Sequence, residues 1–138
     1  MTGTSPLVGI AFNSFAPAAN RSDETISETS VEQTAAELFA ALRDAGYAAV
    51  LLPLRDSLTD LVERLREQPC DLLINLCEAF RGIPQLEPHV AAFFEAMGWP
   101  FTGNGPVTLA LCQQKFVSKA ILQAHGLPCP DGALVQPG

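Results

Sequence analysis

Short apolar runs of strand length alternate with longer amphipathic segments along this chain, and this alternation constrains its fold most. The apolar runs cover residues 7–12, 48–53, 71–76 and 100–102. Strands separated by single helices require right-handed crossovers, which make the strands parallel and place helices on the faces of the sheet. The sequence therefore predicts an α/β, Rossmann-like three-layer domain with a mainly parallel sheet of about 4–5 strands.

The first two helices are predicted from capping signals and helical spacing of apolar residues. After a polar loop over residues 13–27, Thr29 and Glu32 form a capping box, and the helix ends at Gly46. Residues 48–53 are continuously apolar, as in a strand buried on both faces. A second helix starts near Ser57 and ends before proline 69.

Two more helices are predicted in the second half. One ends at Gly98, and the other begins at Pro106, after the turn 103–106, and runs uninterrupted to about His125. The Pro- and Gly-rich tail favours one domain over residues 1–127 and a linker or first strand of a further domain over 128–138. The apolar face of the helix that ends at Gly98 is formed by Val90, Phe93, Phe94 and Met97.

The composition excludes several classes of protein. The chain is 48% hydrophobic and 17% charged, which provides apolar material for one packed core. With a net charge of -7, the chain lacks the excess of basic residues that binding to a nucleic-acid backbone requires. Its apolar runs are far shorter than the ~20 residues that cross a bilayer, and no basic stretch marks a signal peptide. We expect a cytoplasmic protein that binds neither nucleic acid nor membrane.

The cysteines and histidines show no spacing typical of a metal site. We therefore expect buried free thiols and no metal ligand. Cys77 lies beside Glu78 and could act as a nucleophile, but no general base can be assigned, and a packed core thiol is the favoured interpretation. The cysteines are Cys70, Cys77, Cys112 and Cys129, and the histidines are His89 and His125.

Ligands of parallel sheets bind beyond the carboxyl ends of the strands. The segment after the first strand lacks G-x-G-x-x-G, which disfavours a nicotinamide dehydrogenase, and Gly103-x-Gly105 is interpreted as a tight turn. Asn75 and Glu78 close the third strand and could hydrogen-bond an ammonium group. The alternative is a turn-stabilising asparagine and a solvated glutamate.

Two lysines offer a second candidate site. Lys115 and Lys119 are four residues apart on one predicted helix, so both can present cations to a polyphosphate. Solvent-exposed lysines without a ligand are the alternative interpretation.

Residues 71–131 carry a family resemblance. They contain, in order, an apolar strand ending in asparagine, a loop, a helix, a Pro-aromatic-Thr-Gly turn, a lysine-bearing helix and a Gly-aliphatic-Pro-x-Pro segment. The residues are DLLINLCEAFRG and GWPFTGNGPVTLALCQQKFVSKAILQAHGLPCP. This order resembles the N-terminal domain of D-alanine–D-alanine ligases and related ATP-grasp carboxylate-amine ligases. The first 70 residues share only the strand, loop, helix, strand pattern.

The resemblance implies roles for single residues. Lys115 matches the lysine of the family's Asp-Lys motif, which contacts the nucleotide's phosphates, and Gln114 stands in place of the aspartate. The motifs Ser-x-Glu and Gly-Glu-Asp-Gly, which help to hold the first amino acid, have their nearest equivalents in residues 22–30 and 85–88. Neither motif is intact. The candidate substrate-binding residues are Asn75, Glu78 and Glu87; the candidate nucleotide-binding residues are Lys115 and Lys119.

The same resemblance implies a chemistry. In the complete enzyme ATP and Mg²⁺ would activate a carboxylate as an acyl phosphate, which the amine of a small amino-acid-like substrate attacks. Most ATP contacts and the Mg²⁺ ligands would lie in an ATP-grasp domain encoded beyond residue 138, so the chain alone is expected to be inactive and to bind neither cofactor tightly. Without that domain, exposed apolar surface favours a homodimer. The alternative is a non-catalytic Rossmann-like module that binds a small molecule or a protein.

Overall fold

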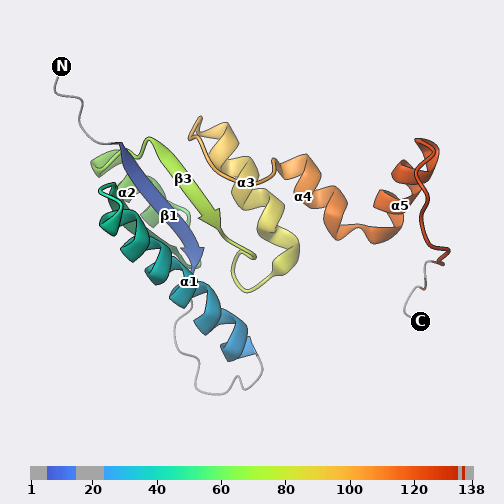
Figure 1. The fold of residues 1–138 in the computed structure, drawn as a ribbon, viewed down its shortest axis with the longest axis horizontal. Coiled ribbons are helices and arrows are strands. Elements are labelled where there is room, and N and C mark those ends of the chain that lie inside the picture. Colours follow the sequence, from blue (N-terminus) through green and yellow to red (C-terminus); the bar gives the residue numbers. More distant parts are fainter. Residues whose placement is uncertain (1–5, 15–23, 134, 136–138) are drawn as a thin grey trace.

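A computed structural model describes residues 6–14, 24–133 and 135 of the chain. Strands β1 (Leu7–Asn13), β2 (Ala48–Leu54) and β3 (Leu72–Leu76) form a parallel sheet in the order β2-β1-β3. Helices cover both faces of this sheet, which confirms the α/β, Rossmann-like class (Figure 1). The described residues contain three strands, fewer than the number expected from the sequence.

The helices follow the alternation seen in the sequence. No helix of the described part is long and apolar enough to cross a membrane. The helices are α1 (Glu24–Asp44), α2 (Thr59–Glu67), the 3-10 turn η1 (Pro84–Leu86), α3 (Glu87–Ala96), α4 (Pro106–Gln113) and α5 (Lys115–Ala124).

The central strand β1 separates two hydrophobic clusters. Successive side chains of a strand point to opposite faces, so Ile10 packs toward Ala35 of α1, whereas Ala11 packs toward Leu61 of α2 and Phe94 of α3. The strand predicted to be buried on both faces, β2, is instead half-buried at the edge of the sheet. This position suits its Pro53, which has no N–H to donate to a neighbouring strand.

Gly9 lets the strands of the sheet pack closely. A Cβ at this position would lie 2.7 Å from Leu52 Cδ1 and 2.8 Å from Leu73 Cδ2. Side chains from both neighbouring strands therefore fill the space above Gly9, and a larger residue would displace them.

The strand predicted over residues 100–102 is reduced to a single parallel bridge between Leu73 and Phe101. The N–H of Leu73 donates to the carbonyl of Pro100 at 2.8 Å, and the N–H of Thr102 donates to the carbonyl of Leu73 at 2.9 Å. The extended segment ends there because Gly103 turns the chain with a φ of 97°. The interpretation of Gly103-x-Gly105 as a tight turn is confirmed.

Helix α1 begins at Glu24, ahead of the capping box predicted at Thr29, so the predicted start is wrong. Residues 24–44 contain neither glycine nor proline, and hence no residue that interrupts helical hydrogen bonding. Polar residues join the helix by bonding back to it: Thr34 Oγ1 donates to the carbonyl of Ser30 at 2.8 Å. Part of the predicted loop, residues 15–23, lies outside the described residues.

Helix α3 confirms most of its predicted apolar face. Val90 and Phe94 are buried, and Phe93 packs edge-to-face on Trp99 with ring centroids 5.6 Å apart. Met97 does not belong to the buried face, because it caps the end of the helix and is 40% exposed.

The single helix predicted from Pro106 to His125 is two helices. Gln114, with φ -102° and ψ 72°, separates α4 from α5. At this break the carbonyl of Leu111 accepts the N–H of Gln114 at 2.9 Å and also a hydrogen bond from the hydroxyl of Ser118. A side chain that adds a hydrogen bond to a carbonyl at the end of a helix helps the helix to break without proline or glycine. Residues 128–133 form neither helix nor strand, and the proposed domain boundary stays a prediction.

Candidate functional site

Asn13 organises the carboxyl edge of the sheet. It ends β1 and is 5% exposed. Its Oδ1 accepts the N–H groups of Glu78 at 2.7 Å and Ala79 at 3.1 Å, and its Nδ2 donates to the carbonyl of Ala79 at 2.7 Å. One buried side chain thus holds the segment after β3 against the end of β1. The sequence placed Asn13 in a loop and missed this role, although an asparagine directly after an apolar run is the same signal that identified Asn75.

Asn75 is the penultimate residue of β3 and Glu78 follows the strand, as predicted, but the surroundings of the two side chains differ. Asn75 Oδ1 accepts the N–H of Cys77 at 3.1 Å, and the N–H of Asn75 donates to Thr102 Oγ1 at 3.1 Å. The asparagine therefore stabilises its own turn. The Glu78 side chain is exposed, while Asn13 fixes its backbone. A ligand at this edge would meet the carboxylate of Glu78.

Cys77 is a packed core thiol, as the favoured interpretation had it. Burial and, to a lesser degree, the negative charge of Glu87 together raise the pKa of its thiol to about 12. The thiol therefore stays neutral and unreactive at physiological pH. All four cysteines are free, but the expectation that all are buried is wrong: Cys112 is exposed, and Cys70 and Cys129 are half-buried. Cys70 packs against the edge of the core cluster that contains Leu73, whereas Cys112 and Cys129 belong to neither cluster.

Glu87 connects the segment after β3 with the end of α4. It is the first residue of α3, and its carboxylate lies near enough to Cys77 to affect that thiol. Gln113, the last residue of α4, donates through Nε2 to Glu87 Oε2 at 3.0 Å and to the carbonyl of Pro84 at 2.9 Å. Gln113 was not predicted, because only the fold brings it to this segment.

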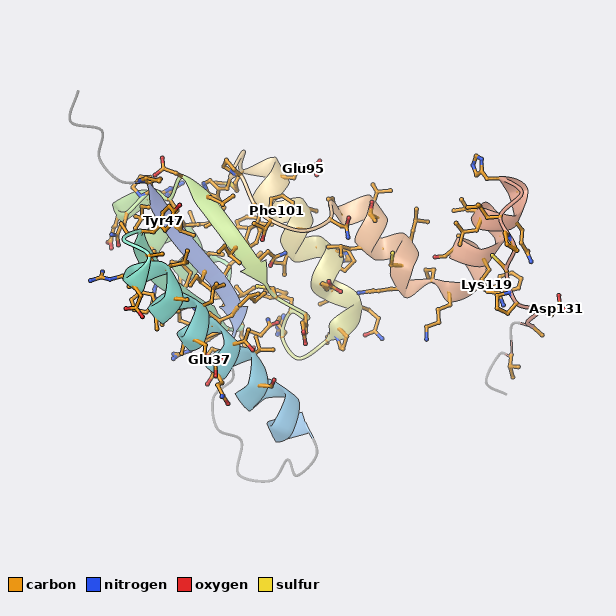
Figure 2. All side chains as sticks on the ribbon, viewed as in Figure 1. Glu37, Tyr47, Glu95, Phe101, Lys119 and Asp131 are labelled. Carbon is orange, nitrogen blue, oxygen red and sulfur yellow. The ribbon has the colours of Figure 1, made fainter. Side chains whose placement is uncertain are left out.

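The two lysines occupy different environments. Lys115 is the exposed first residue of α5, two positions after Gln113. Lys119 Nζ lies 2.7 Å from the position of a Cβ on Gly132, so it faces the C-terminal tail, and Figure 2 shows Lys119 and Asp131 together there. Among the described residues no hydrogen bond joins either lysine to the end of β3. Gln113 is the link between the two regions.

The backbone between Glu78 and Pro84, here called the rim loop (residues 78–84), contains a tight turn. The N–H of Phe80 donates to the carbonyl of Ile83 at 3.2 Å, and the reverse bond is 3.0 Å long. Arg81 and Gly82 between them have φ values of 55° and 70°, as in a type I′ turn. For an arginine this left-handed conformation costs about 1–2 kcal/mol. Of the described non-glycine residues, Arg81 alone has positive φ.

Residues 6–14, 24–133 and 135 contain no group of three His, Cys, Asp or Glu side chains that could hold a metal ion. A cavity of about 200 Å³ lies between β2 and α2 and includes no candidate site residue. It is lined by Val50, Leu52, Arg64, Glu67 and Gln68.

Similar proteins are known, although no protein-family model matches the chain. A D-alanine–D-alanine ligase of Synechococcus sp. (strain JA-3-3Ab) is 33% identical over 91 residues, which are 66% of this chain and 27% of that protein. One from Pelotomaculum thermopropionicum is 32% identical over 104 residues, 75% of this chain and 31% of that protein. The chain thus spans less than a third of the length of these curated relatives.

The fold has a counterpart among solved structures. The D-alanine–D-alanine ligase from Bacillus anthracis, solved in complex with ATP, superposes with a TM-score of 0.69 and 23% identity. The match covers 94% of this chain and 38% of that one. Likeness at this identity concerns the fold, and the curated relatives supply the similarity in sequence. The chain therefore belongs to the D-alanine–D-alanine ligase-like family.

Proposed function

We propose that this chain is the N-terminal, substrate-side domain of an ATP-dependent carboxylate-amine ligase. One observation carries the proposal: a continuous set of polar contacts joins the end of β1 to the start of the lysine-bearing helix. It runs from Asn13 through the rim loop and Glu87 to Gln113, two residues before Lys115. A ligase needs substrate and nucleotide groups held near one another, and this set connects the candidates for both.

The substrate side would recognise an ammonium group. Glu78 is exposed and has a fixed backbone, while the carboxylate of Glu87 already accepts a hydrogen bond from Gln113. Glu78 is therefore the stronger candidate for a charge-assisted hydrogen bond to the amine of an amino-acid-like substrate. Asn75 would act mainly through the turn that it stabilises.

The nucleotide side would offer positive charge to phosphates. Lys115 lies at the amino end of α5, and Gln114 before it makes no side-chain cap. The first amides of α5 and the Lys115 ammonium therefore both suit a phosphate. ATP would supply the phosphoryl group that activates a carboxylate. For Mg²⁺ the described residues provide no matching set of ligands, and we derive no role for this chain in holding it.

The proposal is tested by titrating the 138-residue chain with ATP and following backbone amides by NMR. We expect weak binding that shifts the first turn of α5 and that Lys115→Ala weakens about tenfold, the effect of losing one charge-assisted contact. Lys119→Ala is the matched control; it should have a smaller effect because Lys119 faces the tail. Equal effects of the two substitutions, or shifts confined to other elements, would contradict the assignment.

Turnover provides a second test. Phosphate release from ATP with D-alanine as probe should stay at the buffer rate for this chain alone, because transition-state stabilisation needs groups preorganised around one site. Activity is expected only when an ATP-grasp domain is joined to it. Turnover by the isolated chain would contradict this division. Small-molecule binding that ATP does not affect would favour the non-catalytic module instead.

A further inference from the structure

We propose that Arg81 is a substrate-binding residue that takes the carboxylate group of the amino-acid-like substrate. The inference rests on the proposed function and adds to it a second recognised group. It starts from the conformation of Arg81, because nothing in the fold requires an arginine there. Positive φ favours glycine or asparagine, and either would form the same turn with less strain. A strained residue on a surface turn is expected where its side chain has a use.

The rim loop is held at both ends by side chains from other elements. Asn13 binds Glu78 and Ala79 at one end, and Gln113 binds the carbonyl of Pro84 at the other. The hydrogen bonds between Phe80 and Ile83 fix the turn in between. The backbone of Arg81 is thus preorganised, and a ligand that binds its side chain need not order the loop.

The charge around Arg81 fits a zwitterion. Between Glu67 and Gln114 the sequence contains no other lysine or arginine, whereas Glu78 precedes and Glu87 follows Arg81 around the rim loop. An amino acid carries an ammonium and a carboxylate on one carbon. Glu78 would receive the ammonium, and the planar guanidinium of Arg81, with its paired donors, suits a carboxylate.

The test compares two probes by NMR titration of the 138-residue chain. D-Alanine has both charged groups, whereas D-alaninamide keeps the ammonium and lacks the carboxylate. We expect Arg81→Gly to weaken D-alanine binding about tenfold and to leave D-alaninamide binding unchanged. Arg81→Gly and Arg81→Asn should melt at or above the wild-type temperature, because both residues tolerate positive φ. A loss of binding without a loss of stability separates recognition from folding.

A control substitution and a second anionic probe test whether the effect is specific to Arg81 and to the amino acid. Arg66→Gln removes the same charge from an exposed position on α2 and should leave both affinities unchanged. An equal loss in Arg66→Gln, a lower melting temperature in both Arg81 variants, or no response of the wild-type chain to D-alanine would overturn the proposal. So would shifts of the rim loop with inorganic triphosphate alone, which would assign Arg81 to the nucleotide.

The Arg81 assignment and the proposed function can fail separately. D-Alanine binding that survives Arg81→Gly but is lost in Glu78→Gln would remove Arg81 from the site and leave the proposed function standing. Binding that depends on neither residue would count against both.

Discussion

The body of the molecule (residues 6–14 and 24–102) and the arm formed by α4, α5 and the tail (residues 106–133) are built differently. The body buries β1 between two hydrophobic clusters. The arm extends away from the sheet, and neither α4 nor α5 contains a buried residue (Figure 1). Burial of apolar side chains thus stabilises the body, whereas the apolar side chains of the arm stay exposed and add little to the stability of the fold. Exposed apolar residues of the arm are Val107, Phe116, Val117, Ile121, Leu122 and Leu127.

The largest expected effect comes from the same substitution in the two regions. Leu61 is 1% exposed and Leu122 is 41% exposed. Leu61→Ala should lower the free energy of unfolding by about 2–5 kcal/mol, because it leaves a cavity in the core. Leu122→Ala should change it by about 0.5 kcal/mol or less. Urea denaturation measures both values. Equal losses would mean that α5 packs on the body in solution.

The body and the arm can also be compared at two glycines, Gly9 and Gly132, each of which lies close to side chains of other residues. Gly9→Ala should cost about 1–3 kcal/mol, since a Cβ would meet Leu52 and Leu73 inside the packed sheet. A Cβ on Gly132 would meet only Lys119 Nζ, the end of a flexible side chain. Gly132→Ala should therefore leave the melting temperature unchanged and move only the Lys119 side chain. A large loss in Gly132→Ala would show that the tail supports the fold.

The thiol of Cys77 predicts a pH dependence of the body. Its pKa is raised from 9.0 to about 12 in the folded chain, so in this window the unfolded chain binds fewer protons. The stabilisation is complete below pH 9 and is lost as the pH rises toward 12, by at most about 1.4 kcal/mol per pH unit. Urea denaturation at pH 8 and pH 10 should show a decrease that Cys77→Ala reduces. Cys112→Ala in the arm is the control and should preserve it.

The sequence predicts the body well because burial leaves a periodic pattern. The strands at residues 7–12, 48–53 and 71–76 and the helix that buries Leu61 follow directly from apolar spacing. The prediction of secondary structure fails where no buried contact determines the backbone conformation. The arm has no buried face to keep its helix continuous, and at its break the carbonyl of Leu111 is bonded by the N–H of Gln114 and the hydroxyl of Ser118.

The candidate site was only partly predictable for a related reason. Asn75, Glu78 and Lys115 stand at strand or helix ends that a pattern can locate. Asn13 and Gln113 act through partners that are 65 or more and 26 or more residues away in sequence, respectively. Contacts at that separation are set by the register of the sheet and the path of the arm. The asparagine after an apolar run could have marked Asn13 itself, but no local signal in the sequence reports the partners of Asn13 or Gln113.

The smallest expected effect concerns the junction of the two helices in the arm. Gln114 occupies the N-cap of α5 without a capping hydrogen bond, and an aspartate there would accept one from the first turn. Gln114→Asp should stabilise α5 by about 0.5–1 kcal/mol. Because α5 contains no buried residue, and the bonds of Gln113 join the body to α4, the gain should appear as slower amide exchange within α5 and not in the global urea midpoint. A shift of that midpoint would show that the arm and the body unfold together.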